Sequence, residues 1–303
     1  MPDVSPGTHT VAITGATGLI GSALVSHLRS AGHRVRRLVR GAVKEPGDIR
    51  WDPARGELDV ALLEGCTAVI NLAGASIAQR WTREHRQAIL DSRLKSTALL
   101  ASTMSRMSAK PQVLLSGSAI GIYGDRGDET VDERSAPGSG FLAEVSQGWE
   151  ASAEPAVAAG IRVAYLRTGI VLSPHGGALE KMLTPFRLGL GGPMGGGRQW
   201  MSWITLDDHV RAMTHLLTSS VAGPVNLVAP VPVTNAQFAE LLGEVLHRPA
   251  VLPLPRFALE MLFGEMADGT ILAGQRVRPR VLQESGFQFR HAELREALRS
   301  LLH

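Results

Sequence analysis

The chain has 303 residues, of which 44% are hydrophobic, so it can bury the core of one large α/β domain with a smaller lobe. Its net charge of +3 comes without runs of lysine and arginine or interleaved aromatic residues, which argues against nucleic-acid binding. The single cysteine, Cys66, excludes an internal disulfide and fits a reducing compartment.

Neither a leader nor a membrane span is expected. Residues 1–6 lack a charged start followed by an apolar run, so we expect no signal peptide. No uncharged apolar stretch is long enough to cross a bilayer. We therefore expect a cytoplasmic protein that does not associate with membranes.

The first two elements flank a glycine-rich turn. Residues 11–14 form an apolar strand pattern, and glycines follow at three-residue spacing before a helix expected over 22–31. Gly15 permits a sharp turn, Gly18 lets the backbone approach a pyrophosphate, and Gly21 lets the helix pack closely on the strand. The helix N-terminus then faces the phosphates. An ordinary tight turn is the alternative. The motif predicts dinucleotide binding through Gly15, Thr17, Gly18, Leu19, Ile20 and Gly21.

Strand and helix patterns alternate along the next 200 or so residues. We expect further strands over 35–39, 68–72, 113–116, 163–166 and 225–227, and helices over 85–107 and 144–159. This alternation predicts an α/β fold, a Rossmann-type doubly wound parallel sheet with right-handed connections.

The pattern changes after Thr168. Residues 174–197 are rich in glycine and proline and predict a loop-rich crossing, and short helices separated by prolines follow from Thr234. We expect a dinucleotide-binding domain over 1–170, to which 203–230 return. A smaller, mainly helical C-terminal substrate lobe would comprise 171–202 and 231–303.

The end of the second strand indicates which dinucleotide is bound. NAD-binding folds usually place an acid there, about 20 residues past the glycines, to bond the ribose 2′-hydroxyl. Here Val39 and Arg40 hold that position, and no Asp or Glu occurs between Gly21 and Lys44. The planar guanidinium of Arg40 suits a 2′-phosphate, so we predict NADP(H). A solvated surface arginine is the alternative.

The glycine pattern resembles the extended short-chain dehydrogenase/reductase superfamily, in which a Tyr and a Lys four residues later transfer protons. This chain has two tyrosines, Tyr123 and Tyr165, and a glycine stands four residues beyond each, so the pair is absent. By the order of segments, Phe141 takes the tyrosine place and Val145 the lysine place. Neither side chain can carry a proton at neutral pH.

Two other side chains are candidates for catalysis. Ser118 matches the superfamily serine that polarises a substrate carbonyl or hydroxyl, although a serine at a strand end is also a common cap. Tyr123 is the only tyrosine near the expected site; it is a candidate proton donor, with a structural role as the alternative. His175 and His209 lack partners at metal-ligand spacing, so we expect no metal site.

Motifs along nearly the whole chain resemble the atypical, extended-type short-chain dehydrogenases known as epimerase-family proteins with a C-terminal domain of unknown function. The matching segments include 14–21, 71–74, 116–119, 166–169 and, in the tail, 274–277. The resemblance implies that the missing Tyr/Lys pair is a family trait. It leaves the reaction undefined.

The resemblance also implies cofactor contacts beyond the glycine turn. They comprise the strand-end residues Leu72, Ala73 and Gly74, together with Ser116, Thr168 and Gly169 near the nicotinamide end. Arg93 matches a family arginine that contacts NADP(H) through a phosphate. The alternative for Arg93 is an ion pair with nearby Asp91.

Two functions fit these observations. The first is an NADP(H)-binding oxidoreductase or epimerase acting on an unknown small molecule, in which Ser118, water or a substrate group transfers the proton. The second is a non-catalytic NADPH-binding sensor or regulatory protein, with the tail covering the site. The superfamily often dimerises through the two helices expected here over 85–107 and 144–159, so we expect a monomer or a homodimer.

Overall fold

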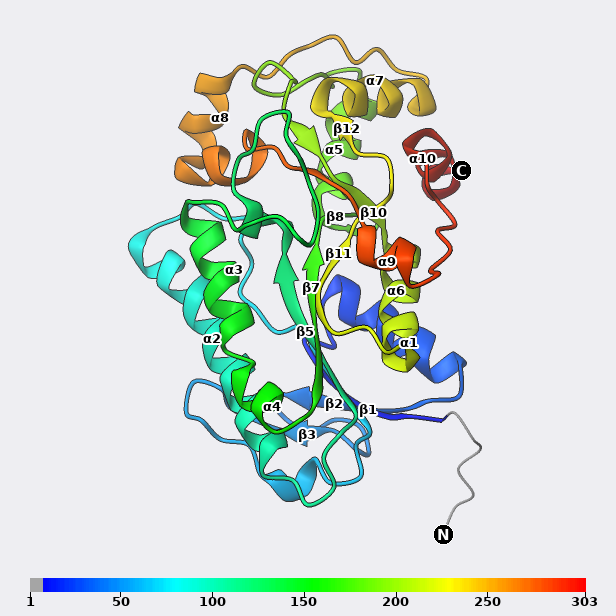
Figure 1. The fold of residues 1–303 in the computed structure, drawn as a ribbon. Helices are drawn as coiled ribbons and strands as arrows, with labels where there is room; N and C mark the ends of the chain where they lie inside the picture. The colour runs from blue at the N-terminus through cyan, green and yellow to red at the C-terminus, as the bar shows by residue number, and fades with distance from the viewer. Residues whose placement is uncertain (1–7) are drawn as a thin grey trace.

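The computed structural model describes residues 8–303, so the segment for which no signal peptide is expected lies outside it. Seven parallel strands form the central sheet in the order β11-β7-β5-β4-β1-β2-β3 (Figure 1). This confirms the predicted doubly wound sheet. The strands are β1 (Thr10–Thr14), β2 (Arg34–Val39), β3 (Ile49–Arg50), β4 (Ala68–Asn71), β5 (Val113–Ala119), β7 (Arg162–Thr168) and β11 (Gly223–Leu227).

Helices cover both faces of the sheet (Figure 1). One face carries α1 (Leu19–Ser30) and α6 (Leu206–Thr218), and the other carries α2 (Arg83–Ser105), α3 (Phe141–Ala151) and α4 (Glu154–Ala158). Successive strand residues point to opposite faces, so both faces bury apolar side chains. In β1, for example, Val11 and Ile13 join the cluster with Leu24 of α1, whereas Ala12 joins the cluster with Leu100 of α2.

Two of the expected helices differ from the structure. The helix expected over 144–159 begins at Phe141 and is broken between α3 and α4. Pro155 near the start of α4 has no N–H with which to continue the ladder of α3. The helix expected over 22–31 begins at Leu19, because Gly18 is its N-cap. The two-residue strand β3 was not predicted, because it is too short to show a period.

A second lobe lies beyond the carboxyl ends of β5 and β7 (Figure 1). It is mainly helical and contains α5 (Gly177–Arg187), α7 (Asn235–Leu246), α8 (Arg256–Phe263) and α10 (Leu294–Leu302). Part of the segment expected to be loop-rich is therefore α5, whose Leu179, Leu183 and Phe186 recur at helical spacing and are buried.

Short elements connect the lobe to the sheet. Three two-stranded ladders, which no period in the sequence predicts, join β8 (Ile170–Ser173) to β10 (Trp203–Thr205), β9 (Trp200–Met201) to β12 (Val233–Thr234), and β6 (Thr130–Val131) to β13 (Arg276–Val277). The remaining short helices are η1 (Val60–Leu62), η2 (Ile120–Tyr123), η3 (Ala267–Ile271) and α9 (Arg280–Glu284). Leu282 and Phe287 of the tail belong to the same apolar cluster as β1, so the domain boundaries stay a prediction.

Within residues 8–303, no helix combines the length and the apolar character needed to cross a bilayer.

Candidate functional site

The glycine turn joins β1 to α1 at the carboxyl edge of the sheet. Gly15 has a positive φ of 65°, and a Cβ there would lie 2.6 Å from the Leu72 carbonyl oxygen. A Cβ on Gly21 would lie 2.2 Å from the Gly15 carbonyl oxygen. Both glycines are therefore required by packing within the protein itself.

Gly18 is different, because the space in front of it is open. A Cβ on Gly18 would meet only the Gly15 carbonyl oxygen, at 3.4 Å. Gly18 is the N-cap of α1, and no side chain caps that helix end. The first turn of α1 therefore directs its N–H groups and positive dipole end at a place that fits a pyrophosphate. Thr17 is exposed beside it, Leu19 packs on Gly176, and Ile20 packs on the core.

A small hydrogen-bond network fixes the end of β4 beside this turn. Thr14 Oγ1 donates to Asn71 Oδ1 (2.7 Å) and accepts from the backbone N–H groups of Leu72 (3.0 Å) and Ala73 (3.1 Å). Asn71 Nδ2 donates to Thr97 Oγ1 (2.8 Å). Leu72 and Ala73, predicted to contact the cofactor, are thus held next to Gly15. The sequence did not indicate the supporting role of Thr14, which depends on two strands meeting.

Arg93 lies beside Gly74 and is largely buried. Its Nη1 donates to the carbonyl oxygens of Ala75 and Ile89, both at 3.1 Å, and its guanidinium stacks 4.9 Å from the Trp149 ring. A Cβ on Gly74 would lie 3.2 Å from Arg93 Cζ. Burial lowers the pKa of Arg93 to about 10.

The expected alternative, an ion pair between Arg93 and Asp91, is wrong. Asp91 instead accepts from Lys95 Nζ at 2.8 Å, one helical turn away. Nowhere in the described part of the chain does a carboxylate pair with Arg93. A buried guanidinium without a carboxylate at the edge of a dinucleotide fold fits a ligand phosphate.

Val39 and Arg40 lie at the carboxyl end of β2, as the strand pattern predicted. Arg40 is exposed, and residues 8–303 offer it no side-chain hydrogen bond or ion pair. Both the 2′-phosphate and the surface interpretations of Arg40 are compatible with this geometry.

Ser118 and Tyr123 belong to one buried network that links β5, α3, β7 and β11. Ser118 Oγ donates to Glu150 Oε1 (2.7 Å), and Arg167 donates to both carboxylate oxygens of Glu150, from Nε (2.8 Å) and Nη2 (2.9 Å). Arg167 Nη1 donates to Tyr123 Oη (3.0 Å), whose proton goes to Asn226 Oδ1 (2.8 Å). Glu150, Arg167 and Asn226 carried no signal as site residues, because they are far apart in the sequence.

The network determines where the hydroxyl protons of Tyr123 and Ser118 are directed. Tyr123 is fully buried, and burial raises the pKa of its phenol, so the geometry favours the structural role. Ser118 is 4% exposed and its proton is directed at Glu150. Its remaining lone pairs can accept a hydrogen bond from a substrate hydroxyl, whereas a carbonyl would need a donor.

The residues expected near the nicotinamide end lie in different environments. Ser116 is fully buried, and its Oγ has no partner in the described part of the chain. Thr168 Oγ1 lies 3.0 Å from Nε2 of His209, a fully buried histidine whose pKa burial lowers to about 4. A Cβ on Gly169 would lie 2.5 Å from the Ser202 carbonyl oxygen, so packing requires this glycine. Residues 8–303 contain no group of three or more His, Cys, Asp or Glu side chains suited to a metal ion.

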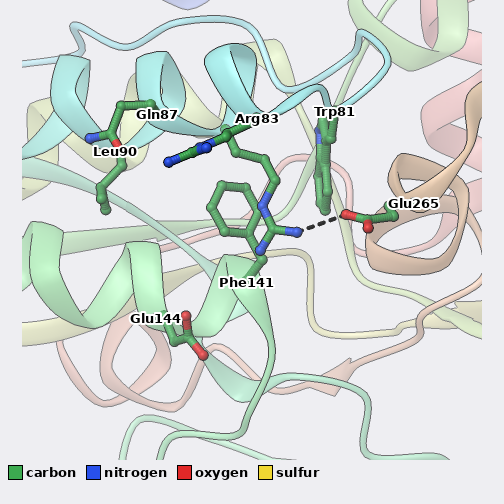
Figure 2. A pocket seen from close by; sticks show the side chains of 8 residues that line it. Trp81, Arg83, Gln87, Leu90, Phe141, Glu144 and Glu265 are labelled. Carbon is green, nitrogen blue, oxygen red and sulfur yellow. Dashed lines mark hydrogen bonds and ion pairs between the residues drawn. The ribbon is translucent and has the colours of Figure 1, made fainter.

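Phe141 and Val145, which we expect at the place of the superfamily's Tyr/Lys pair, lie among apolar and aromatic side chains. The Phe141 ring packs edge-on against Trp81 at 5.0 Å, and the Arg86 guanidinium lies 4.3 Å above it. Val145 is buried with Trp81, Ile89 and the tail residue Met266. The tail also reaches this place through Glu265, which pairs with Arg86 at 2.7 Å (Figure 2). A cleft of about 450 Å³ opens here between α2, α3 and the tail.

Known proteins match the chain along nearly its whole length. The family model "NAD dependent epimerase/dehydratase family" matches residues 11–228, and "Domain of unknown function (DUF1731)" matches residues 254–301. An epimerase family protein of Mycobacterium bovis is 45% identical over 290 residues, which cover 95% of this chain and 96% of that protein. The chloroplastic SDR39U1 homolog of Arabidopsis thaliana is 40% identical, covering 97% and 86% respectively.

Solved structures agree with these matches. The crystal structure of human epimerase family protein SDR39U1 (isoform 2) with NADPH has a TM-score of 0.87 at 36% identity, covering 96% of this chain and 98% of that chain. A UDP-glucose 4-epimerase of Thermus thermophilus, at 19% identity and a TM-score of 0.76, shares the fold. The resemblance inferred from the motifs is thereby confirmed. The chain belongs to the NAD dependent epimerase/dehydratase family and carries the DUF1731 domain at its C-terminus.

Proposed function

We propose that the protein binds NADP(H) and acts as an oxidoreductase or epimerase on a small molecule. The observation that carries this proposal is the largely buried guanidinium of Arg93, which has no carboxylate partner in residues 8–303 and lies beside Gly74, in the segment after β4 whose Leu72 packs against Gly15 of the glycine turn. The exposed Arg40 at the end of β2, where NAD-binding folds have an acid, favours the 2′-phosphorylated cofactor. Human SDR39U1, at 36% identity, was crystallised with NADPH.

When bound, NADP(H) supplies the hydride chemistry, and the chain's own residues supply binding and proton transfer. Ser118 Oγ accepts a hydrogen bond from the substrate hydroxyl. As that hydroxyl proton moves to Ser118 Oγ, the serine's own proton moves to Glu150 Oε1, 2.7 Å away. Arg167 holds Glu150 in place through two hydrogen bonds. In this proposal the Ser118–Glu150 pair replaces the missing Tyr/Lys pair.

A second candidate is a non-catalytic NADPH-binding sensor or regulatory protein. It is favoured by Phe141 and Val145, which fill the place of the catalytic pair together with Met266 of the tail. Under this alternative the cofactor binds in the same groove, and no hydride leaves it.

Two measurements separate the candidates. Titrating the purified protein with NADPH and NADH tests the cofactor, and we expect a clear preference for NADPH that Arg40→Ala weakens. Incubating the complex of deuterated NADPH with a metabolite extract tests turnover. Deuterium in a metabolite establishes an oxidoreductase and identifies its substrate. Tight NADPH binding without transfer favours the sensor.

We further propose a cytoplasmic protein without nucleic-acid or membrane partners, and a monomer or a homodimer paired through α2 and α3. The single cysteine and the scattered positive charge support the first part. Light scattering on the eluted protein tests the second part, because a monomer has a mass of 32.3 kDa.

A further inference from the structure

Residues 72–82, which join β4 to α2, begin beside the glycine turn. A Cβ on Gly15 would lie 2.6 Å from the Leu72 carbonyl oxygen, so the start of the segment is packed against that turn. Farther along, the carbonyl oxygen of Ala75 accepts a hydrogen bond from Arg93 Nη1 at 3.1 Å. The position of this part of the segment therefore depends on where the Arg93 guanidinium lies.

The other end of the same segment packs against the tail. Trp81 Nε1 donates to the Ile77 carbonyl oxygen at 3.0 Å, which closes this end of the segment on itself. The Trp81 ring lies against Gly269 of η3, where a Cβ would be 2.5 Å from Cη2 of the indole. The ring is also buried with Met266, and Figure 2 shows it beside the tail residue Glu265. One short segment thus contacts both the glycine turn and the tail.

Arg93 can bond this segment and a ligand at the same time. Its Nη1 donates to the carbonyl oxygens of Ala75 and Ile89, whereas its Nε and Nη2 make no hydrogen bond within residues 8–303. Nε and Nη2 together form the edge of a guanidinium that binds two phosphate oxygens side by side. A phosphate on this edge restricts the guanidinium, and it therefore also restricts the segment that is bonded to Nη1.

We infer that residues 72–82 couple cofactor binding at Arg93 to docking of the tail segment 263–271. A phosphate on Arg93 orders the segment that presents Trp81, and the ordered ring stabilises the docked tail against local opening. Coupling is reciprocal, so the docked tail strengthens cofactor binding by the same factor. The inference rests on the proposed binding of NADP(H). It makes the order of a tail surface, on which Glu265 is exposed, depend on occupancy of the cofactor site.

Hydrogen exchange of the full chain, with and without saturating NADPH, tests the coupling. Any ligand slows exchange that requires global unfolding, so α10 is the control, because its Leu294 and Leu298 pack in the second lobe away from Trp81. We expect NADPH to slow exchange of the amides in 263–272 about fivefold more than exchange of the amides in α10. Equal slowing in both regions of a saturated protein overturns the inference.

Gly269→Ala tests the same coupling from the side of the tail. Its methyl group would lie 2.5 Å from the Trp81 ring, so the ring and the tail must separate. By reciprocity we expect the Kd values for NADPH and NADH to rise about fivefold each, since both cofactors contain the pyrophosphate. Leu262→Ala, at an exposed position of the tail, is the control and should leave both values unchanged.

Unchanged Kd values in a folded Gly269→Ala protein contradict the coupling. If Gly269→Ala does not fold, Glu265→Gln decides, because it removes the exposed ion pair between the tail and Arg86. That variant should raise both Kd values about twofold, and equal affinities to the wild type overturn the inference. A wild-type protein that binds no NADPH contradicts the proposed function itself, before the tail is considered.

Discussion

Arg93 carries a charge whose burial costs free energy, and only backbone carbonyl oxygens and the Trp149 ring offset that cost in residues 8–303. Such an arrangement is poor for stability alone, since an uncharged side chain of similar length would avoid the desolvation. It is explained if a phosphate completes the environment. The charge is therefore better understood as part of a binding site than as part of the core.

This argument predicts the effect of Arg93→Gln. The pyrophosphate is common to both cofactors, so the affinities for NADPH and for NADH should each fall about tenfold to a hundredfold. Thermal unfolding should occur at an unchanged or higher temperature. Titration with both cofactors and a melting curve measure these effects, and Lys95→Gln on the same helix is the control. Loss of NADPH affinity alone would place Arg93 at the 2′-phosphate instead.

His209 makes the stability of the protein depend on pH. It is fully buried, bonded through Nε2 to Thr168, and its pKa is lowered from 6.5 to about 4. Between these values the unfolded chain binds the proton and the folded chain does not. Keeping His209 neutral therefore costs no unfolding free energy above about pH 6.5. Below that value the unfolding free energy decreases as the pH falls towards 4.

We expect the wild type to lose about 2 kcal/mol more unfolding free energy than His209→Gln between pH 6.5 and pH 5. Urea unfolding of both proteins at the two pH values measures this difference. An equal change of unfolding free energy between the two pH values in both proteins would show that His209 is protonated in the folded state, or that its surroundings admit water.

At the scale of elements, the strand–turn–helix unit of β1 and α1 contains two glycines that packing requires, and a third, Gly18, that we assign to cofactor binding. Gly21 approaches the Gly15 backbone, so a methyl group there must displace a main chain. Gly18 faces open space at the helix N-terminus, where φ is −77° and alanine is not strained. Packing therefore constrains Gly21, whereas the proposed cofactor constrains Gly18, three residues before it.

This difference predicts opposite outcomes for two alanine variants. Gly21→Ala should cost about 3 kcal/mol of unfolding free energy. Gly18→Ala should lower the melting temperature by no more than about 4 °C, yet weaken NADPH binding strongly by placing a methyl group against the pyrophosphate. Melting curves and cofactor titrations on both proteins provide the comparison. Full NADPH affinity in Gly18→Ala would show that the cofactor does not approach this turn.

For the whole molecule, the DUF1731 tail over 254–301 is part of the core, not an appendage. Leu282 and Phe287 join the apolar cluster of β1 and α1, and Leu294 and Leu298 join the cluster of the second lobe. Met266 packs with Val145, at the position where we expect the superfamily's lysine. The tail therefore packs against both the sheet and the second lobe.

A tail shared by both clusters predicts one cooperative unfolding transition. Leu282→Ala and Leu298→Ala each truncate a fully buried side chain. Each should lower the free energy of unfolding by about 2–5 kcal/mol, while the protein still unfolds in one transition. Calorimetry is the measurement, with Leu262→Ala on an exposed position of α8 as the control. Two separate transitions in either variant would show that the lobes unfold independently.

Local patterns in the sequence determined the parallel sheet, the glycine turn, the arginine after β2 and the absence of a Tyr/Lys pair. These features depend on neighbouring residues, because strand and helix periods and glycine conformations act over a few positions. The helix break at Pro155 and the ladders of two or three residues were missed, since such short segments show no period.

Only the tertiary structure decided which partners the candidate site residues have. The hydroxyl of Tyr123 donates to Asn226, 103 residues away, and that of Ser118 donates to Glu150, 32 residues away. Asp91 lies two positions from Arg93 in the sequence but bonds Lys95, and Asp48 is neutralised by a strand that precedes it. Charge pairing and burial depend on which elements pack together, and no local pattern contains that information.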